Sequence, residues 1–242
     1  MASERKIAWI TGGGTGIGLG AAKELAKDGW TVVVSGRRSD VLEKAVREIG
    51  AGASSIVLDV AVDADVVRAA KQVVDQHGRI DLLVNSAGIN VPNRRWNDMT
   101  TEAWNKVVGI NLDGLLYCMH AVLPTMRAQQ GGTIINVASW AGRFHGRISG
   151  VVYTTTKHAV VALTHTCNME EFRNGIRACA FCPGEVATDI MKLRPVPPSA
   201  EDLARMLQPE DVGRTIAFIA GMPKHVCINE VLISPTWNRS FV

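Results

Sequence analysis

The chain has 242 residues and a formal net charge of +3, with 47% hydrophobic and 20% charged residues, a balance typical of one globular domain with ample core material. Its Lys and Arg residues are scattered, which argues against the dense basic stripe of a nucleic-acid surface. No apolar run reaches the ~18 residues that indicate a membrane span, so we expect neither nucleic acid nor a membrane as partner.

Strand and helix signals alternate along the whole chain. Short runs rich in β-branched residues predict strands at 6–11, 31–35, 55–60, 79–85, 133–138, 176–182 and 230–234. Apolar periodicity and capping residues predict helices at 17–28, 40–50, 102–129 and 150–172, and further helices that begin near residues 63, 199 and 209. Such alternation predicts an α/β fold: a doubly wound (Rossmann) parallel sheet of about seven strands with helices on both faces.

No linker or repeat divides the chain, so we expect a single domain over residues 1–242. The proline-containing segment around residues 190–207 is either a lid that closes over a bound ligand or a static surface excursion. Residues 1–6 lead directly into the first expected strand and leave no room for a secretion signal, so we expect a cytoplasmic protein.

No metal site is expected. The five cysteines are an odd number, which is typical of reduced thiols. Cys179 and Cys182 form a CxxC pair, but they fall within an expected strand, where positions three apart face opposite sides. The six histidines show no HExxH spacing.

A glycine-rich turn, Gly12 to Gly18, follows the first expected strand and opens the first expected helix. Glycines let the backbone approach a pyrophosphate, and the helix N-terminus offers free N–H groups with a partial positive charge. The spacing is TGxxxGxG rather than GxGxxG. The context predicts a dinucleotide site, and the alternative is a flexible turn without a ligand.

The loop after the second expected strand reads Ser35-Gly36-Arg37-Arg38 and holds no acid. An acid at this place would bind the adenosine ribose of NAD, whereas arginine binds a ribose 2′-phosphate. We therefore expect NADP, with NAD as the less favoured cofactor. In the alternative, both arginines form a solvated helix entry.

Tyr153 and Lys157 are four residues apart on an expected helix and therefore share a face. A nearby ammonium favours the phenolate, so we expect Lys157 to lower the tyrosine pKa and make the phenol a general acid or base. An ordinary surface pair is the alternative, since the motif alone is weak. Ser139 ends the fifth expected strand, at the sheet edge where open α/β sheets bind ligands.

Two asparagines stand in telling places. Asn85 ends the fourth expected strand, and Asn111 lies inside a helix among apolar residues. A buried amide needs hydrogen-bond partners, so Asn111 is either functional or a satisfied structural amide.

Taken in order, these motifs resemble those of the short-chain dehydrogenase/reductase family, in its compact single-domain branch. The resemblance covers nearly the whole chain. It rests on Thr11-Gly12-x-x-x-Gly16-x-Gly18, Asp59-Val60, Asn85-Ser86-Ala87-Gly88, Asn111, Ser139, Tyr153 with Lys157, and Pro183-Gly184-x-Val186-x-Thr188.

The resemblance implies a role for each matching position. Tyr153 is implied as the general acid/base, Lys157 as its partner and a ligand of the nicotinamide ribose, Ser139 as the group that polarises the carbonyl, and Asn111 as the holder of a water in a proton relay. The residues implied to bind the cofactor are Gly12, Thr15, Gly16, Ile17, Gly18, Arg37, Arg38, Asp59, Val60, Asn85, Ala87, Gly88, Tyr153, Lys157, Pro183, Gly184, Val186 and Thr188.

Three positions depart from the family pattern. Ser86 replaces an asparagine, Thr155 stands where Ala or Ser is common, and Ser139 lies 14 residues before Tyr153, about one more than is usual. The extra residue must be accommodated in the loop that follows Ser139, so these departures affect the shape of the substrate pocket rather than the reaction type.

Basic and aromatic residues gather in the loops expected to flank the nicotinamide. We expect Trp140, Arg143 and His145 to contact the substrate. An anionic substrate, such as a carboxylate or sulfonate held by Arg143 or a neighbour, is one hypothesis. The other is that these arginines are solvated.

We therefore predict an NADP-dependent short-chain alcohol dehydrogenase or carbonyl reductase that acts on a small-molecule carbonyl/alcohol pair. A dinucleotide-binding sensor or scaffold without catalysis is the main alternative. An epimerase or dehydratase that retains its cofactor is another. Because related proteins pair through the two long helices, we also expect a homo-oligomer, either a dimer or a homotetramer.

Overall fold

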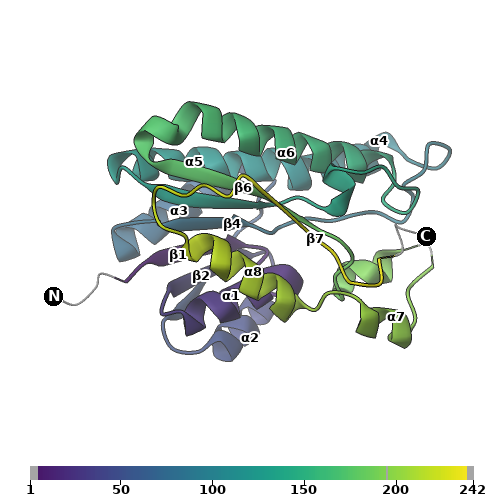
Figure 1. The fold of residues 1–242 in the computed structure, drawn as a ribbon, viewed down its shortest axis with the longest axis horizontal. Helices are drawn as coiled ribbons and strands as arrows, with labels where there is room; N and C mark the ends of the chain where they lie inside the picture. Colours follow the sequence, from purple (N-terminus) through teal and green to yellow (C-terminus); the bar gives the residue numbers. More distant parts are fainter. Residues whose placement is uncertain (1–4, 195, 239–242) are drawn as a thin grey trace.

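In a computed structural model of the protein, which describes residues 5–194 and 196–238, seven parallel strands form one sheet in the order β3-β2-β1-β4-β5-β6-β7 (Figure 1). The strands are β1 (Ile7–Thr11), β2 (Thr31–Gly36), β3 (Ala53–Val57), β4 (Leu82–Asn85), β5 (Gly132–Val137), β6 (Ile176–Pro183) and β7 (Glu230–Ile233). The doubly wound Rossmann sheet expected from the sequence is confirmed.

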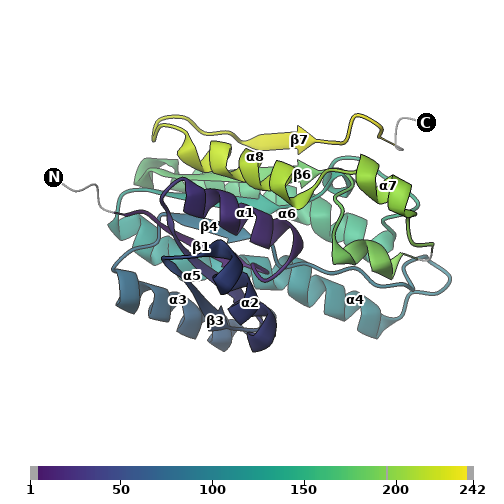
Figure 2. The same ribbon diagram turned by 90° about the horizontal axis from the view of Figure 1, so that it is seen from below.

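Helices cover both faces of the sheet (Figure 1, Figure 2). The helices are α1 (Gly16–Lys27), α2 (Ser39–Ile49), α3 (Asp63–His77), α4 (Thr101–Val108), α5 (Gly114–Ala128), α6 (Val151–Glu171), α7 (Ala200–Arg205) and α8 (Pro209–Gly221). One apolar core lies between the sheet and α3, α5 and α6, and a second lies between the sheet and α1, α2 and α8. The central strands β1 and β4 are buried throughout, which explains their continuous apolar sequences.

The strand register aligns the carboxyl ends of the central strands. Thr11 pairs with Ser35 on one side and with Asn85 on the other, and Asn85 pairs with Asn136. The chain order reverses between β1 and β4, which makes a topological switch point. Ligands of open α/β sheets bind in the crevice outside the carboxyl ends at such a point.

Three elements differ from their expected form or bounds. Strand β4 begins at Leu82, not at residue 79. Strand β3 ends at Val57, not at residue 60, because its partner β2 ends at Gly36, opposite Val57. The expected helix 102–129 contains a wider π-helical turn, η1 (Gly109–Asp113), between α4 and α5. Such turns are rare and are frequent at functional sites.

The continuous helical segment Thr101–Ala128 is long and apolar enough to cross a membrane by length and composition. Of its most apolar window, 50% is buried inside the protein. Core helices of globular proteins pass the same test, and Val107, Cys118 and Val122 on this segment are fully buried.

Candidate active site

The glycine-rich turn connects β1 to α1 with two residues in the left-handed region, Gly12 (φ +64°) and Gly16 (φ +53°). A Cβ at Gly12 would lie 2.8 Å from the backbone of Ala87, and one at Gly18 would lie 2.4 Å from the carbonyl oxygen of Gly12. These positions therefore require glycine, and the turn can pack directly against the end of β4. The N-terminus of α1 is left open toward a cavity.

That cavity, the nucleotide cavity, measures about 570 Å³ and lies at the carboxyl ends of the strands. Most residues expected to bind a cofactor line it, namely Gly12, Thr15, Gly16, Ile17, Arg37, Arg38, Asp59, Val60, Ala87, Gly88, Tyr153, Lys157, Pro183, Gly184, Val186 and Thr188. The shape and the donors fit an extended dinucleotide: free helix N–H groups and a glycine cradle in the middle, cations at one end and Tyr153 at the other.

Gly18 and Asn85 do not line the nucleotide cavity. Gly18 packs against Gly12 below the turn, as described above. Asn85 is buried and donates from Nδ2 to Oδ1 of Asn136 at 2.9 Å, while its own Oδ1 is buried without a hydrogen-bond partner. The position of Asn85 therefore supports the sheet edge beneath the cavity rather than its wall.

Arg37 and Arg38 lie at the far end of the nucleotide cavity, between β2 and α2. Both are exposed, and neither side chain forms an ion pair or hydrogen bond with another described residue. Asp59 lines the same end and accepts a hydrogen bond from the backbone N–H of Ala61 at 3.0 Å. The two guanidinium groups are thus available to an anion.

Tyr153 and Lys157 lie one turn apart on α6 and both line the nucleotide cavity. Lys157 is 4% exposed, and its Nζ donates to the backbone carbonyl of Val137 at the end of β5, at 2.7 Å. Its Nζ lies 5.5 Å from the centre of the Tyr153 ring. Burial lowers the pKa of Lys157 to about 8.

The direction of the Tyr153 pKa shift differs from the expectation. Burial raises the pKa of Tyr153 above its ordinary value. Ser139 and, more weakly, the positive charges of Arg194 and Arg94 act against this rise, but burial prevails. Lys157 is not among the groups that lower this pKa, so the lowering expected from it does not appear, and the loss of hydration outweighs the effects of Ser139, Arg194 and Arg94.

Ser139 follows β5 and caps the short 3₁₀ helix Trp140–Gly142, its Oγ accepting from the N–H of Ala141 at 3.2 Å. It lies in the same cavity as Tyr153, and its side chain interacts with the phenol. The structure thus brings together three of the four residues expected to be catalytic: Ser139, Tyr153 and Lys157.

Asn111, the fourth, lies in the π-helical turn and is 1% exposed. Its Oδ1 accepts from the N–H of Ile89 at 2.8 Å, and its Nδ2 donates to the carbonyl of Ile89 at 2.9 Å. A Cβ at Gly88 would lie 3.5 Å from Asn111 Oδ1 and 3.7 Å from Lys157 Nζ. The amide therefore fixes the loop after β4 beside Lys157, and its side chain is satisfied as a structural amide.

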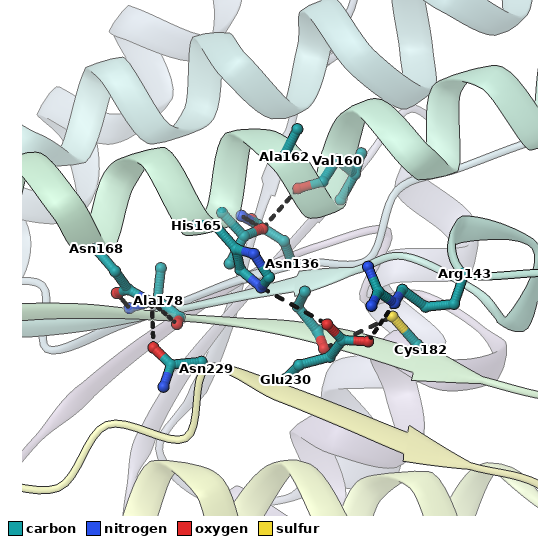
Figure 3. Close-up of polar contacts among 12 residues, drawn as sticks. Asn136, Arg143, Val160, Ala162, His165, Asn168, Ala178, Cys182, Asn229 and Glu230 are labelled. Atoms are coloured by element: carbon teal, nitrogen blue, oxygen red, sulfur yellow. Dashed lines mark hydrogen bonds and ion pairs between the residues drawn. The ribbon is translucent and has the colours of Figure 1, made fainter.

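A second cavity, the outer cavity, measures about 400 Å³. Trp140 and His145 line it, as expected for residues near a substrate. Arg143 does not: its Nε lies 3.0 Å from Glu230 Oε1, and Glu230 also faces His165 at 3.6 Å (Figure 3). The acid on β7 draws Arg143 away, so the expectation that Arg143 contacts a substrate finds no support in the geometry.

The segment around 190–207 contains a 3₁₀ turn, η4 (Asp189–Leu193), and the helix α7, which lies near the carboxyl end of the sheet (Figure 1). Ile190 and Met191 line both cavities. A parallel bridge between Val186 and Leu207 holds the two ends of the excursion together. The sequence points to the segment 190–207 but does not single out Ile190 or Met191 as residues that line the site.

Comparisons with known proteins agree with this geometry. The family model for short chain dehydrogenases matches residues 6–195. A relative from Staphylococcus epidermidis, named an uncharacterized oxidoreductase, is 31% identical over 96% of this chain and 98% of its own length.

Solved structures of the same fold include the closed form of a serine dehydrogenase complexed with NADP+, with a TM-score of 0.88, 28% identity, and coverage of 95% of this chain and 94% of that one. They also include a 3-ketoacyl-(acyl-carrier-protein) reductase from Brucella melitensis complexed with NADH, with a TM-score of 0.87, 28% identity, and coverage of 96% and 97%. The family match and the whole-chain similarity confirm the resemblance found in the motifs: this chain belongs to the short-chain dehydrogenase family of oxidoreductases.

Proposed function

We propose that the protein interconverts a small carbonyl compound and its alcohol with NADP(H), with Tyr153 as general acid/base. One observation carries this proposal: Ser139 and Tyr153 line both the nucleotide cavity and the outer cavity. A substrate in the outer cavity would meet the cofactor at these two hydroxyls. A bound nicotinamide dinucleotide supplies or accepts the hydride.

The chain's own residues divide the remaining work. In the reduction direction, the Ser139 hydroxyl holds the carbonyl oxygen, and Tyr153 donates its proton to that oxygen as negative charge develops. In oxidation, Tyr153 accepts the proton. Lys157 adds a positive charge at the ring, and Asn111 keeps the loop after β4 in register. Holding both reactants at one junction replaces a bimolecular encounter.

The tyrosine role has a matched control, because the chain has only two tyrosines and Tyr117 lies on α5 away from both cavities. Tyr153→Phe should lower kcat by at least ~100-fold while NADPH binding, followed by fluorescence, is retained. Tyr117→Phe should retain activity. Wild-type turnover by Tyr153→Phe would exclude the acid/base role.

A preference for NADP over NAD is supported by Arg37 and Arg38, exposed at the end of the nucleotide cavity and available to a 2′-phosphate. The related structures include complexes with NADP+ and with NADH, so the fold is compatible with either cofactor. Arg37→Gln combined with Arg38→Gln should raise KM for NADPH by roughly 10- to 100-fold and leave KM for NADH nearly unchanged. An equal loss for both cofactors would contradict this assignment.

Two other functions give different readouts. A non-catalytic sensor would bind NADPH but consume none with any aldehyde, ketone or oxo acid. An epimerase or dehydratase would convert substrate without net release of NADP. A screen of carbonyl compounds by NADPH absorbance, with a parallel alcohol screen with NADP, separates these outcomes from the proposed one.

We also propose a homo-oligomer, either a dimer or a tetramer, assembled through the outer surfaces of α4, α5 and α6. These helices form one continuous layer on a single face of the sheet (Figure 1). Sedimentation at several protein concentrations tests this assembly, and a monomer at micromolar concentration would contradict it.

A further inference from the structure

The outer cavity touches the reaction centre directly. It shares Ser139, Tyr153, Gly184, Ile190 and Met191 with the nucleotide cavity. Its volume, about 400 Å³, suits a small molecule rather than a long chain. The side chains that line the rest of this cavity therefore determine which molecules can reach Tyr153.

One of them, Arg94, is a buried cation in the loop after β4. The residue is 4% exposed and lies in the wall of the outer cavity. Nε donates to the carbonyl of Val91 at 2.7 Å, Nη1 to that of Ile148 at 3.1 Å, and Nη2 to that of Leu193 at 2.6 Å. A guanidinium has five N–H groups, so two are left by these bonds.

All three partners of Arg94 are neutral carbonyls. Among residues 5–194 and 196–238, no carboxylate lies within ion-pairing distance of it. Asp98 attracts it only weakly, and Asp98 itself is exposed and accepts from the N–H of Arg95. A buried charge that lacks a counterion is destabilising, and such a charge at a cavity wall favours an anionic ligand.

The other ionisable groups of the outer cavity do not cancel this charge. Nη1 of Arg194 lies 2.6 Å from Oε1 of Glu185, and both side chains are largely buried. That pair is neutral as a unit. Arg147 adds a further positive charge, and it is exposed. With three arginines and one glutamate, the described cavity wall is positive, and its excess buried charge resides on Arg94.

Arg94 also lines the same cavity as Tyr153, the proposed general acid/base. Its charge and that of Arg194 both act on the phenol of Tyr153. Because Arg94 and Tyr153 line the same outer cavity, an anion bound to Arg94 would share that cavity with the reacting carbonyl group. We propose that the substrate is a short oxo acid or hydroxy acid, and that Arg94, flanked by Arg194, binds its carboxylate or sulfonate. This inference rests on the proposed function and names the substrate class of the same site.

A structural role is the alternative, because Arg94 joins three segments that surround the cavity. The two roles give different results when an acid is compared with its neutral ester. A purely structural change lowers kcat/KM for both, and loss of the anion site lowers it for the acid alone. The test compares kcat/KM for the isomers of oxopentanoate with kcat/KM for their methyl esters, at saturating NADPH.

The wild type should prefer the acid by roughly 100-fold for at least one isomer. Arg94→Gln should reduce this acid/ester ratio by roughly 30-fold or more, whereas Arg94→Lys, which keeps the charge, should retain part of it. Arg143→Gln is the matched control, since Arg143 is paired with Glu230 outside the cavity, and its ratio should not change. A wild type that prefers the ester, or an unchanged ratio in Arg94→Gln, overturns the inference.

Binding separates this inference from the proposed function. Pentanoate and pentanamide are titrated by calorimetry into the protein with NADPH. If the wild type binds pentanoate more tightly than pentanamide and Arg94→Gln loses this difference, the anion site is supported. If no carbonyl compound is reduced as well, the proposed function fails and the anion site stands. Turnover of esters with equal binding of both probes supports the function and overturns the anion site. If Arg94→Gln does not fold, the wild-type comparison and Arg194→Gln, expected to lower the acid/ester ratio by about 5-fold, decide the question.

Discussion

Lys157 should destabilise the free protein, and this effect can be measured. The ammonium is buried, its hydrogen-bond partner is the neutral carbonyl of Val137, and burial lowers its pKa from 10.5 to about 8. Each pKa unit corresponds to about 1.4 kcal/mol, so the charged form costs the folded state about 3 kcal/mol near pH 7. Replacing the lysine by methionine removes this cost but leaves the Val137 carbonyl without its donor, a loss of about 1 kcal/mol.

Lys157→Met should therefore increase the free energy of unfolding at pH 7 by about 2 kcal/mol while it lowers turnover. The sign with pH follows from the lower pKa in the folded state. The folded protein binds fewer protons between pH 8 and 10.5, so the Lys157 cost is complete below pH 8 and is lost as the pH rises toward 10.5. At pH 9.5 the cost should be about 1 kcal/mol, and the advantage of the variant should nearly disappear.

Urea unfolding of the cofactor-free wild type and Lys157→Met at pH 7 and pH 9.5 measures this difference. Lys71→Met, at an exposed lysine, controls for the loss of one positive charge. A variant less stable than the wild type at both pH values, or a stability difference that is independent of pH, would refute the reasoning.

Two glycine substitutions and one arginine substitution test how the glycine-rich turn, the α1–α8 contact and the loop after α8 are packed. Gly18→Ala brings a Cβ to 2.4 Å from the Gly12 oxygen, so it should weaken NADPH binding in a fluorescence titration and lower the thermal midpoint. Gly213→Ala brings a Cβ to 2.4 Å from the Gly20 oxygen where α8 crosses α1; urea unfolding should show a loss of about 1–3 kcal/mol with NADPH affinity retained. Arg177→Gln removes a guanidinium that donates to the carbonyls of Val226 at 2.7 Å and Met222 at 2.8 Å, in the loop after α8. The free energy of unfolding in urea should fall by about 2 kcal/mol. Wild-type stability in either of the last two would contradict these packing arguments.

The fold was predictable because each of its elements has a local signal. Apolar runs of strand length, capping residues and glycines at helix ends identify the elements, and alternation of strands and helices then leaves few topologies. The errors arose where an element depends on a neighbour. Strand β3 stops at Val57 because β2 stops opposite it, and this pairing cannot be read from residues 55–60 alone.

The candidate site was predictable in its residues but not in its electrostatics. The motifs identified Ser139, Tyr153 and Lys157, and these converge at one cavity. The Tyr153 pKa is raised rather than lowered because its hydration depends on packing from distant segments. Spacing along one helix determines which side chains are neighbours, but not how much water surrounds them.

The two loop arginines, Arg94 and Arg143, illustrate the same limit. Both belong to polar loops, and the sequence offered Arg143 first because it follows Ser139. Its partner Glu230 lies on β7 at the other end of the chain, so only the tertiary fold reveals that Arg143 is paired with an acid (Figure 3). For Arg94 the sequence holds one signal, the glycine at position 150 at the start of an expected helix. In the structure Gly150 has φ +79°, and a Cβ there would lie 2.6 Å from Arg94. A glycine that precedes a helix can mark such a close approach.

Lys157 and Arg94 are the two buried cations that lower the stability of the free protein. Both are buried beside Tyr153, and both donate to backbone carbonyls, which satisfy hydrogen bonds without cancelling charge. Arg194, by contrast, is neutralised by Glu185. An acid beside either unpaired cation would stabilise the free protein and would also remove the positive potential at the phenol and at the outer cavity. Stability and reactivity therefore oppose each other at these two side chains, and bound ligands that bring negative charge should restore the stability that the free protein lacks.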